Sequence, residues 1–518
     1  MRLVVLGGLR LQLVGIVGSG STITYVPVIV WDRVEHLAKE EQLVIIDDGK
    51  RGIKYLGILR NSRRYEPFLS AYRRTSYVDN PALADAGTLP HTSAYAALVG
   101  TLESRSIGEV QLPPNPGSKI YIVEGATDLG ISLGEGLIIG NHKYSGIEVP
   151  LDPHWLPYHL AVVGATGTGK SRLVKALIDE VLAKTEYSMI VFDHTGLDYV
   201  RFYPDRVVEA SRVVLDVSLI TDLMLERSGL DARTYDPYFI TAVLYYIYRE
   251  LPPELRAEVF GSESSTAQRG LVSSGRGSDL RNFLSRLDRV DYEKLMAVMS
   301  RSPVEWSRER FKEAVGEIAR SFSTKESVRV RLGVAVDIKL GEGFFRSLSS
   351  RDLLPSGIVD EALKKRLVVV DLSTEELVIR RYVVASVVSE LWRRIEVSRK
   401  PVNTVVVVDE AHNYACRYCG GAKSAIGRIA REGRKWGLGA VLVTQRIIDL
   451  DPDIRGNINT WFFSKLQTPS DFSELSGYMN LAGISEQSLA VLGSREFYVA
   501  GLMNPLKIPV LIRVREVE

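Results

Sequence analysis

The chain of 518 residues is 45% hydrophobic and 25% charged, with a net charge of +2, which is ordinary globular composition. At roughly 150 residues per domain, its length predicts about three domains. A net charge this small excludes a globally basic coat protein for nucleic acid, so any nucleic-acid contact must come from local patches. No run approaches the ~18 apolar residues of a membrane helix. The N-terminal MRLVVLGGLRLQLVGIV alternates like a strand rather than a signal peptide, so we expect a soluble, cytoplasmic protein without membrane association.

Residues 1–150 predict a β-rich domain, either a small barrel or a sandwich. Short β-branched segments bounded by Gly, Asp or Asn recur there: STITYVPVIVW, EQLVIIDD, KIYIVEG and EGLIIGNH. The segment GIVGSGST (15–22) imitates a phosphate-binding loop. No Gly-Lys follows it, and the next residues have a strand pattern, so we reject that interpretation.

A basic stretch, Lys50 to Arg74, lies within this domain. It holds eight basic residues and one acidic residue, with four aromatic residues between them. Such a stretch can bind nucleic acid or an acidic partner. A solvated sheet edge is the simpler interpretation and the one we favour.

The pattern changes near residue 151 to strand, helix and strand, the beginning of a parallel sheet covered by helices. We expect an α/β ATPase core over 151–216 and 356–518, because continuous apolar runs such as VNTVVVVDE and LGAVLVTQ are typical of buried parallel strands. Residues 217–355 have helical periodicity and predict an inserted helical subdomain, with a mobile loop at GSESSTAQRGLVSSGRGSD (261–279).

The strongest motif is GATGTGKS, which fits GxxxxGK[ST] between an apolar strand and a helix. Its glycines let backbone N–H groups curl around an anion at the positive end of the helix. Lys170 is expected to reach the β- and γ-phosphates, and Ser171 to bind Mg²⁺. The predicted ATP-binding residues are Gly164, Ala165, Thr166, Gly167, Thr168, Gly169, Lys170, Ser171 and Arg172.

A second motif, VVVVDEAHNY, places Asp409 and Glu410 at the carboxyl end of a buried strand, where ligands bind in open α/β sheets. Asp409 is predicted to hold the Mg²⁺ or its water, and Glu410 to orient and deprotonate the attacking water. An acidic base beside a metal favours hydrolysis over transfer to another acceptor.

Polar residues end two other strands of the same sheet. Gln445 ends a strand that we expect beside the Asp-Glu strand, so it is predicted to contact the γ-phosphate or the water. Asp193 ends another strand, and the sequence fits equally well with a role near the nucleotide or in coupling to DNA and with no such role. His194 and His159 have no spacing that pairs them as metal ligands.

The two cysteines, Cys416 and Cys419, form one CxxC. A zinc site needs four ligands, and His412 supplies at most one more. A redox-active or structural disulfide is an alternative, but a loop that merely contains two thiols is the interpretation we favour.

Together these motifs resemble the HerA/FtsK superfamily of DNA-translocating ATPases, and within it the archaeal HerA helicases. The resemblance rests on HLAVVGATGTGKS, FDHTG, VVVVDEAHNY, IAREGRKWGLGAVLVTQR and INTWFFSKLQTPSDFSELSGY. It implies a RecA-like core, a homo-hexameric ring around DNA, ATP and Mg²⁺ as cofactors, and a partner nuclease of the NurA type in DNA end resection. The β-rich N-terminus is similar in layout to the small barrel that HerA proteins carry.

The resemblance also implies that an arginine of one subunit completes its neighbour's ATP site. Arg434 stands at that position, with Arg431 as the second candidate. On a continuing helix, Arg428 and Lys435 would belong to a solvated face with Glu432. Two departures stand out: Tyr158 replaces an arginine common before the first core strand, and Asp193-His-Thr-Gly-Leu-Asp-Tyr replaces Asp-Pro-His-Gly-Glu-Tyr.

Three functions fit these motifs. The first is a DNA translocase or helicase in double-strand break repair. The second is a packaging or conjugation motor of the same superfamily. A nucleotide switch that serves as a scaffold is the third, and Glu410 argues against it, because a switch needs no base placed beside the metal.

Overall fold

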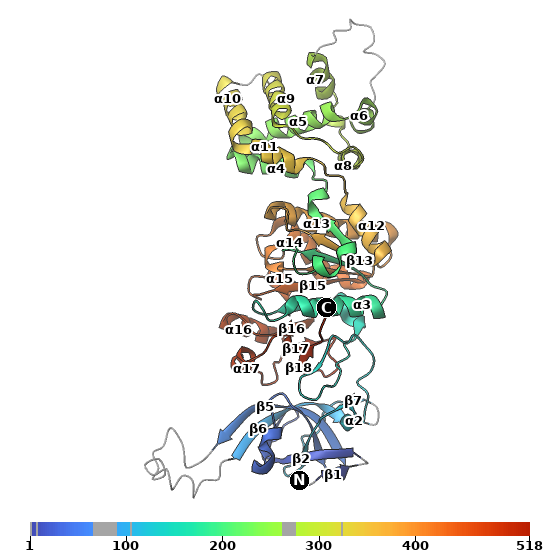
Figure 1. The fold of residues 1–518 in the computed structure, drawn as a ribbon, viewed down its shortest axis with the longest axis vertical. Helices are drawn as coiled ribbons and strands as arrows, with labels where there is room; N and C mark the ends of the chain where they lie inside the picture. The colour runs from blue at the N-terminus through green and yellow to red at the C-terminus, as the bar shows by residue number, and fades with distance from the viewer. Residues whose placement is uncertain are drawn as a thin grey trace, which may run out of the picture. The chain divides into compact units, whose positions relative to one another are not determined.

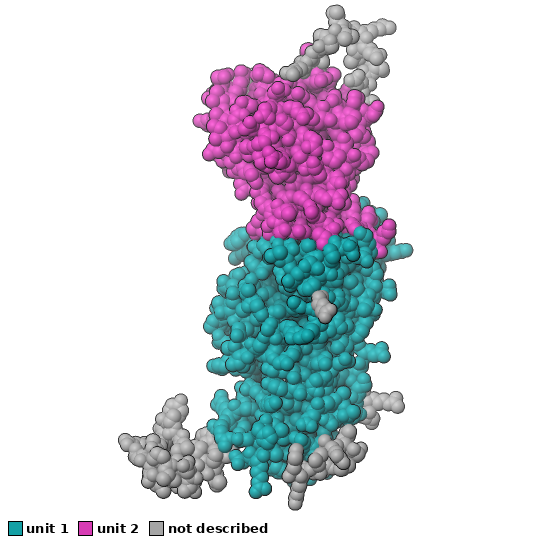
Figure 2. All heavy atoms as spheres, in the orientation of Figure 1, with its two compact units in different colours: residues 1–206, 365–369, 391–518 teal, residues 207–364, 370–390 magenta. Residues whose placement is uncertain are grey.

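The computed structural model describes residues 3–6, 9–65, 91–103, 106–261, 276–322 and 325–517. The chain forms two compact units (Figures 1 and 2). The first unit comprises residues 1–206, 365–369 and 391–518, and the second comprises residues 207–364 and 370–390. The part of the basic stretch from residue 66 onward, and positions 262–275 of the predicted mobile loop, lie outside the described residues.

The first unit begins with a closed β-barrel. Its strands run in the order β1-β2-β3-β6-β5-β4-β8, with β7 beside β6, and β8 pairs back onto β2 to close the barrel. The strands are β1 Leu3–Leu6, β2 Leu9–Val17, β3 Tyr25–Val30, β4 Leu43–Asp48, β5 Ile53–Tyr65, β6 His91–Leu102, β7 Ile107–Gly108 and β8 Lys119–Ile122. Of the two architectures predicted, the barrel is therefore the one that forms.

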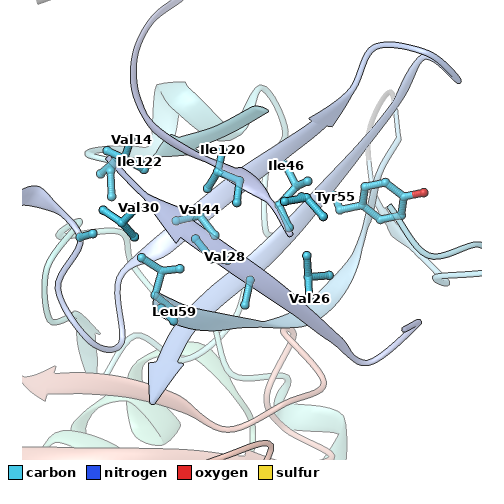
Figure 3. Close-up of a cluster of buried hydrophobic side chains, with 14 of the residues drawn as sticks. Val14, Val26, Val28, Val30, Val44, Ile46, Tyr55, Leu59, Ile120 and Ile122 are labelled. Carbon is cyan, nitrogen blue, oxygen red and sulfur yellow. The ribbon is translucent and has the colours of Figure 1, made fainter. Parts of the chain in front are cut away.

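Alternation along the strands fills this barrel. On β3, Val26, Val28 and Val30 are buried, while the residues between them face outward. Their side chains meet those of the neighbouring strands, such as Val44, Ile46 and Ile120, in one apolar cluster (Figure 3). Closure removes the exposed sheet edges that an open sheet of this size would leave.

One predicted barrel strand belongs elsewhere. The segment EGLIIGNH contributes β9, Gly140–His142, which pairs antiparallel with β18, Val510–Val514, at the edge of the ATPase sheet. The expectation that it joins the N-terminal β-domain was wrong. A short apolar run fits a strand of either sheet, so the sequence pattern alone does not show which sheet it joins.

The ATPase sheet of the first unit runs in the order β13-β11-β14-β15-β10-β16-β17-β18-β9. Strands β11, β14, β15, β10 and β16 are parallel, and β17 and β18 continue antiparallel. Their bounds are β10 Leu160–Val163, β11 Ser188–Asp193, β13 Leu367–Asp371, β14 Thr404–Val408, β15 Leu438–Thr444, β16 Thr460–Phe463 and β17 Glu496–Gly501. β10, β11, β14 and β15 are buried along their whole length, as the apolar runs predict.

Helices of the first unit connect these strands: α3 Lys170–Lys184, α14 Gly420–Glu432, α15 Pro452–Arg455, α16 Pro469–Tyr478 and α17 Glu486–Ala490. β15 lies between β14 and β10, so the strand that ends in Thr444-Gln445 is beside the Asp-Glu strand, as predicted. The α/β core with a parallel sheet is confirmed.

The second unit is mostly helical. It contains α4 Val217–Ser228, α5 Ala232–Glu250, α6 Pro253–Phe260, α7 Arg276–Leu284, α8 Tyr292–Arg301, α9 Arg308–Ser321, α10 Glu326–Val334, α11 Gly341–Leu348, α12 Pro355–Lys365 and part of α13 Leu377–Ser398. Aspartates cap several of them; Asp216, for instance, accepts a hydrogen bond from the Leu219 N–H at the start of α4. An aromatic cluster packs inside, with Tyr246 stacked on Trp306. No helix in the described part of the chain is long and apolar enough to cross a membrane.

The basic stretch holds one residue with a structural role. Arg60 is 0% exposed, and its guanidinium donates hydrogen bonds to the Glu41 carboxylate and to the carbonyl oxygens of Leu481, Ala482 and Pro509. Arg60 lies on β5 of the barrel, whereas these carbonyls belong to the C-terminal part of the ATPase core. For Arg60, therefore, neither the solvated edge nor the nucleic-acid contact holds.

We predict that Arg60→Met lowers the free energy of unfolding by ~3–5 kcal/mol, because it leaves the buried Glu41 carboxylate without its cationic partner. Arg64→Met is the matched control, since Arg64 is half exposed and pairs with Glu35 at the surface. Thermal and urea unfolding followed by circular dichroism would compare the two variants. Equal stability of the two variants would contradict the structural role of Arg60.

Candidate nucleotide-binding site

The P-loop lies between β10 and α3. Gly167 and Gly169 have φ values of 81° and 96°, a region that side chains other than glycine rarely adopt. The Lys170 ammonium donates a hydrogen bond to the carbonyl oxygen of Gly164 at 2.9 Å, and so lies across the mouth of the loop. Successive backbone N–H groups and the N-terminus of α3 make this loop an anion-binding site.

Asp409 and Glu410 follow β14 at the carboxyl edge of the sheet. Asp409 is 4% exposed, and its Oδ2 atom has no hydrogen-bond partner among the described residues. Glu410 has φ 43°, in the left-handed region, which is rare for a residue with a side chain and is found mainly at functional sites.

Gln445 connects Glu410 to the P-loop. Its Nε2 donates to Glu410 Oε1 at 3.0 Å, and its Oε1 accepts from the Thr166 hydroxyl at 3.1 Å. The three residues come from β15, β14 and the P-loop, so adjacent parallel strands bring them together.

Sequence reasoning missed Asp198 as a member of this site. Its Oδ1 atom accepts a short hydrogen bond from the Ser171 hydroxyl, and its Oδ2 atom accepts one from the Thr195 hydroxyl at 3.0 Å. Oxygen atoms of Asp193, Asp198 and Asp409 all lie within 4.8 Å of one another. The signal that could have found Asp198 is an acidic residue five positions after a strand that already ends in aspartate.

The donor set fits a magnesium ion. Mg²⁺ prefers oxygen ligands, usually one or two carboxylates together with phosphate and water. Here a buried carboxylate oxygen of Asp409 without a partner, the Ser171 hydroxyl and the Asp198 carboxylate lie together beside the P-loop. These are the residues that could hold the ion.

Burial and mutual repulsion govern the electrostatics of the site. Burial raises the pKa of Asp409 well above its ordinary value, and the charges of Asp198, Glu410 and Asp193 raise it further. Burial also lowers the pKa of Lys170, which the nearby carboxylates partly oppose. A cation placed among the carboxylates would lower the pKa of Asp409 and so favour its charged form.

Arg172 faces away from these groups. Its guanidinium donates to the carbonyl oxygen of Val517 and lies 5.7 Å from the ring centre of Phe202. These contacts do not direct Arg172 toward the P-loop, and its contact with ATP stays a prediction.

The candidate arginines lie at the opposite edge of the sheet. Contrary to the continuous helix assumed from the sequence, α14 ends at Glu432 and a 3₁₀ turn, η10, covers Gly433–Trp436. This turn precedes β15, and the Gly437 carbonyl accepts from Thr404 N–H at the start of β14. Seven residues of β15 span about 20 Å, so Arg434 cannot reach the Glu410 of its own chain.

The basic residues of this segment have different surroundings. Arg428 forms an ion pair with Glu396 at 2.8 Å and stacks over Trp392, which confirms its predicted place on a salt-bridged face. Arg431 and Arg434 are exposed and make no ion pair within the described ranges. The Arg434 guanidinium lies 5.7 Å from the ring centre of Tyr158, the residue that departs from the family pattern.

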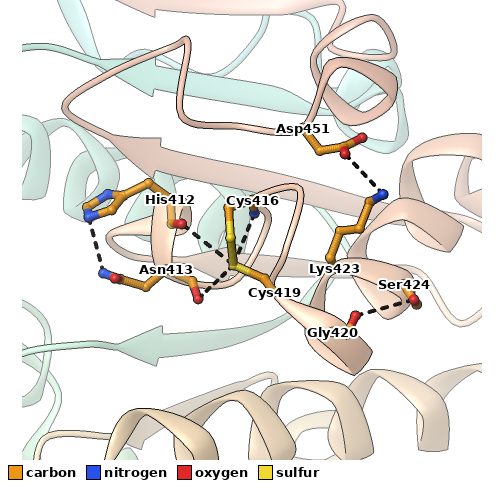
Figure 4. Close-up of a disulfide and its surroundings, with 8 residues drawn as sticks. All are labelled: His412, Asn413, Cys416, Cys419, Gly420, Lys423, Ser424 and Asp451. Atoms are coloured by element: carbon orange, nitrogen blue, oxygen red, sulfur yellow. Dashed lines mark hydrogen bonds and ion pairs between the residues drawn. A yellow bond between two sulfur atoms is a disulfide. The ribbon is translucent and has the colours of Figure 1, made fainter.

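Cys416 and Cys419, which follow the Asp409-Glu410 motif in the chain, form a disulfide (Figure 4). This corrects the preferred interpretation of two separate thiols, and it leaves no thiolate for zinc. The Cys419 sulfur accepts from the Cys416 N–H, and α14 begins at the next residue. On α14, which follows the disulfide, the Lys423 ammonium forms an ion pair with the Asp451 carboxylate at 3.0 Å (Figure 4).

We predict that reduction of this disulfide lowers the free energy of unfolding by ~2 kcal/mol, the loop-closure value for so short a loop. Thermal melting with and without a reductant would measure the difference. A double variant, Cys416→Ser with Cys419→Ser, should melt like the reduced protein and ignore the reductant. A wild-type melting temperature unaffected by reduction would contradict the prediction.

Comparison with known proteins identifies related sequences. The family described as Helicase HerA, central domain, matches residues 137–395. The chain is 25% identical to a DNA double-strand break repair helicase HerA of Sulfolobus acidocaldarius, over 90% of this chain and 87% of that protein. It is 22% identical to the Pyrococcus furiosus protein of the same name, over 81% and 77% of the two chains.

Among solved structures, VirB4 of Thermoanaerobacter pseudethanolicus is 15% identical, with a TM-score of 0.44 over 74% of this chain and 97% of that chain. Because the HerA central domain matches half of the chain, including the whole P-loop, this protein belongs to the HerA helicase family.

Proposed function

We propose that the protein hydrolyses ATP and moves along DNA as a hexameric ring. The observation that carries the proposal is the group of Lys170, Asp409, Glu410 and Gln445 at one edge of the parallel sheet. A phosphate-binding lysine, a buried metal-binding carboxylate and a base held by an amide are the parts that phosphoryl transfer to water requires.

Each residue has its own role in this reaction. The backbone N–H groups of the P-loop and the Lys170 ammonium bind the β- and γ-phosphates. Glu410 accepts the proton of the attacking water, and Gln445 keeps its carboxylate in place through the 3.0 Å hydrogen bond. When bound at Ser171 and Asp409, Mg²⁺ would supply charge compensation for the phosphates.

The arginine that completes the site comes from a neighbouring subunit in this proposal. Arg434 lies at the sheet edge opposite its own P-loop, is exposed, and makes no ion pair with described residues of its own chain. Arg431, also exposed in the last turn of α14, is the second candidate. Arginines acting in this way are worth ~10³–10⁵ in rate in GTPase systems.

The DNA substrate and the partner are inferred from the relatives. Several are named DNA double-strand break repair helicases. We infer that this chain acts on double-stranded DNA or its single-stranded ends, and that a NurA-type nuclease works with it in end resection. The alternative is a DNA-packaging or conjugation motor, which would use the same ATP site with a different partner.

The test is ATPase activity with and without linear DNA. We predict stimulation by DNA in the wild type, no hydrolysis by Lys170→Ala, and a loss of ~10²–10⁴-fold in Glu410→Gln, the range for removal of a general base. Glu410→Gln should still bind a fluorescent ATP analogue, because the P-loop is intact. Near-normal turnover by Glu410→Gln would contradict the base, and an assembled ring indifferent to DNA would favour a scaffold.

Subunit mixing tests the arginine. Arg434→Ala and Lys170→Ala chains should each be inactive alone and partly active together, because about a quarter of the interfaces in a random equimolar ring join an intact P-loop to an intact arginine. Arg428→Ala is the control, since its ion pair and stacking lie within its own chain. Rescue by mixing with Arg431→Ala but never with Arg434→Ala would reassign the role to Arg431.

A further inference from the structure

Asp198 lies on a loop whose shape is fixed by Asp193. Both oxygens of Asp193 accept hydrogen bonds from the loop itself, from the N–H groups of Thr195, Gly196, Tyr199 and Val200. Asp193 is therefore occupied in holding its own loop and has little capacity left for a ligand. That arrangement answers the question left open by the sequence: Asp193 shapes the loop that presents Asp198.

The Asp198 carboxylate is placed against the P-loop helix. It accepts from the hydroxyl of Ser171, the residue expected to bind Mg²⁺ in any P-loop protein, and from Thr195 on its other oxygen. These two contacts fix the position of its negative charge within 4.8 Å of the Asp409 carboxylate.

Buried polar atoms at this site lack a hydrogen-bond partner within the part of the chain described. They include Asp409 Oδ2, on a side chain that is 4% exposed, the hydroxyl of Tyr199, which is 0% exposed, and Glu410 Oε2, which lies 3.3 Å from His412 Nδ1. Buried polar groups are normally satisfied, so unpaired ones beside three carboxylates point to a ligand that binds oxygen.

A purely structural role does not explain why residue 198 carries a negative charge. The Ser171 hydroxyl needs only an acceptor oxygen, which a neutral asparagine would also offer. The half-buried Asp198 carboxylate instead adds repulsion beside the buried carboxylates of Asp193 and Asp409, whose charges are costly unless they are compensated. A divalent cation supplies that compensation.

We propose that Asp198 belongs to the metal site as a second acidic group beside Asp409, and that its negative charge strengthens the binding of the Mg²⁺ that accompanies ATP at Ser171 and Asp409. This inference rests on the proposed ATP site. In this inference Asp198 helps to hold the metal ion, whereas Glu410 transfers the proton.

The test is Mg²⁺-dependent binding of a fluorescent, non-hydrolysable ATP analogue to the full chain. Asp198→Asn keeps an acceptor for Ser171 but loses the charge. We expect the Mg²⁺ concentration for half-maximal binding to rise about 10-fold or more, the usual effect of losing a group that supports a metal ligand. Binding in EDTA should be unchanged or tighter, because a negative charge near the phosphates is gone.

Two variants serve as controls. Asp198→Glu restores the charge and should recover most of the Mg²⁺ affinity, and Asp205→Asn removes an exposed carboxylate from the same part of the chain, outside the cluster. An unchanged Mg²⁺ requirement in Asp198→Asn overturns the inference. So does an equal loss of binding with and without Mg²⁺ together with a lower melting temperature, which would show a structural role only. Absence of Mg²⁺-dependent binding in the wild type would instead defeat the proposed ATP site.

Discussion

The candidate site depends on an excess of negative charge at the carboxyl edge of the parallel sheet. Asp193, Asp198, Asp409 and Glu410 meet there, and burial of Asp193 and Asp409 limits the screening of their charges by water. Lys170 is the cation placed among them, and burial lowers its own pKa. The fold tolerates this arrangement because Asp193 is satisfied by four backbone N–H groups and Asp198 by two hydroxyls. The hydroxyls hold Asp198 in place without neutralising it, so the charges of Asp409 and Asp198 are those that a bound cation would compensate.

Strand topology decides which groups can share that edge. β11, β14, β15 and β10 are parallel neighbours. Residues that follow these strands therefore lie close together at one edge of the sheet, although they are as far apart in the chain as Val163 and Gln445. The segment that precedes β15 lies at the amino edge of the same sheet, and Arg434 belongs to this segment. A site of the proposed kind that uses this arginine therefore requires a second chain, because the length of β15 separates the two within one chain.

Sequence patterns predicted the parts of this site that depend on local geometry. The P-loop needs glycine at positions of positive φ and a helix behind it, and Asp409-Glu410 follows a run of valines, so each motif is readable from a few adjacent residues. Asp198 was missed because its importance comes from a hydrogen bond to Ser171, 27 positions away in the chain. Arg60 was misplaced for the same reason, because the carbonyl oxygens that accept its hydrogen bonds lie more than 400 positions further on. The end of α14 was misjudged because Gly433 is compatible with both an α-helix and a 3₁₀ turn.

Tyr158 is the nearest aromatic neighbour of Arg434. It stands where the family resemblance led us to expect an arginine. Here the ring of Tyr158 instead lies under Arg434, and Trp155 packs edge-on against that ring at 4.8 Å. A cation over an aromatic face is attracted without being neutralised. Arg434 thus has no ion-pair partner among the described residues, whereas a carboxylate partner would have to be displaced before the arginine could approach a phosphate. Under the proposed ring arrangement, Tyr158 does not supply a second cation; its ring instead orients the Arg434 guanidinium.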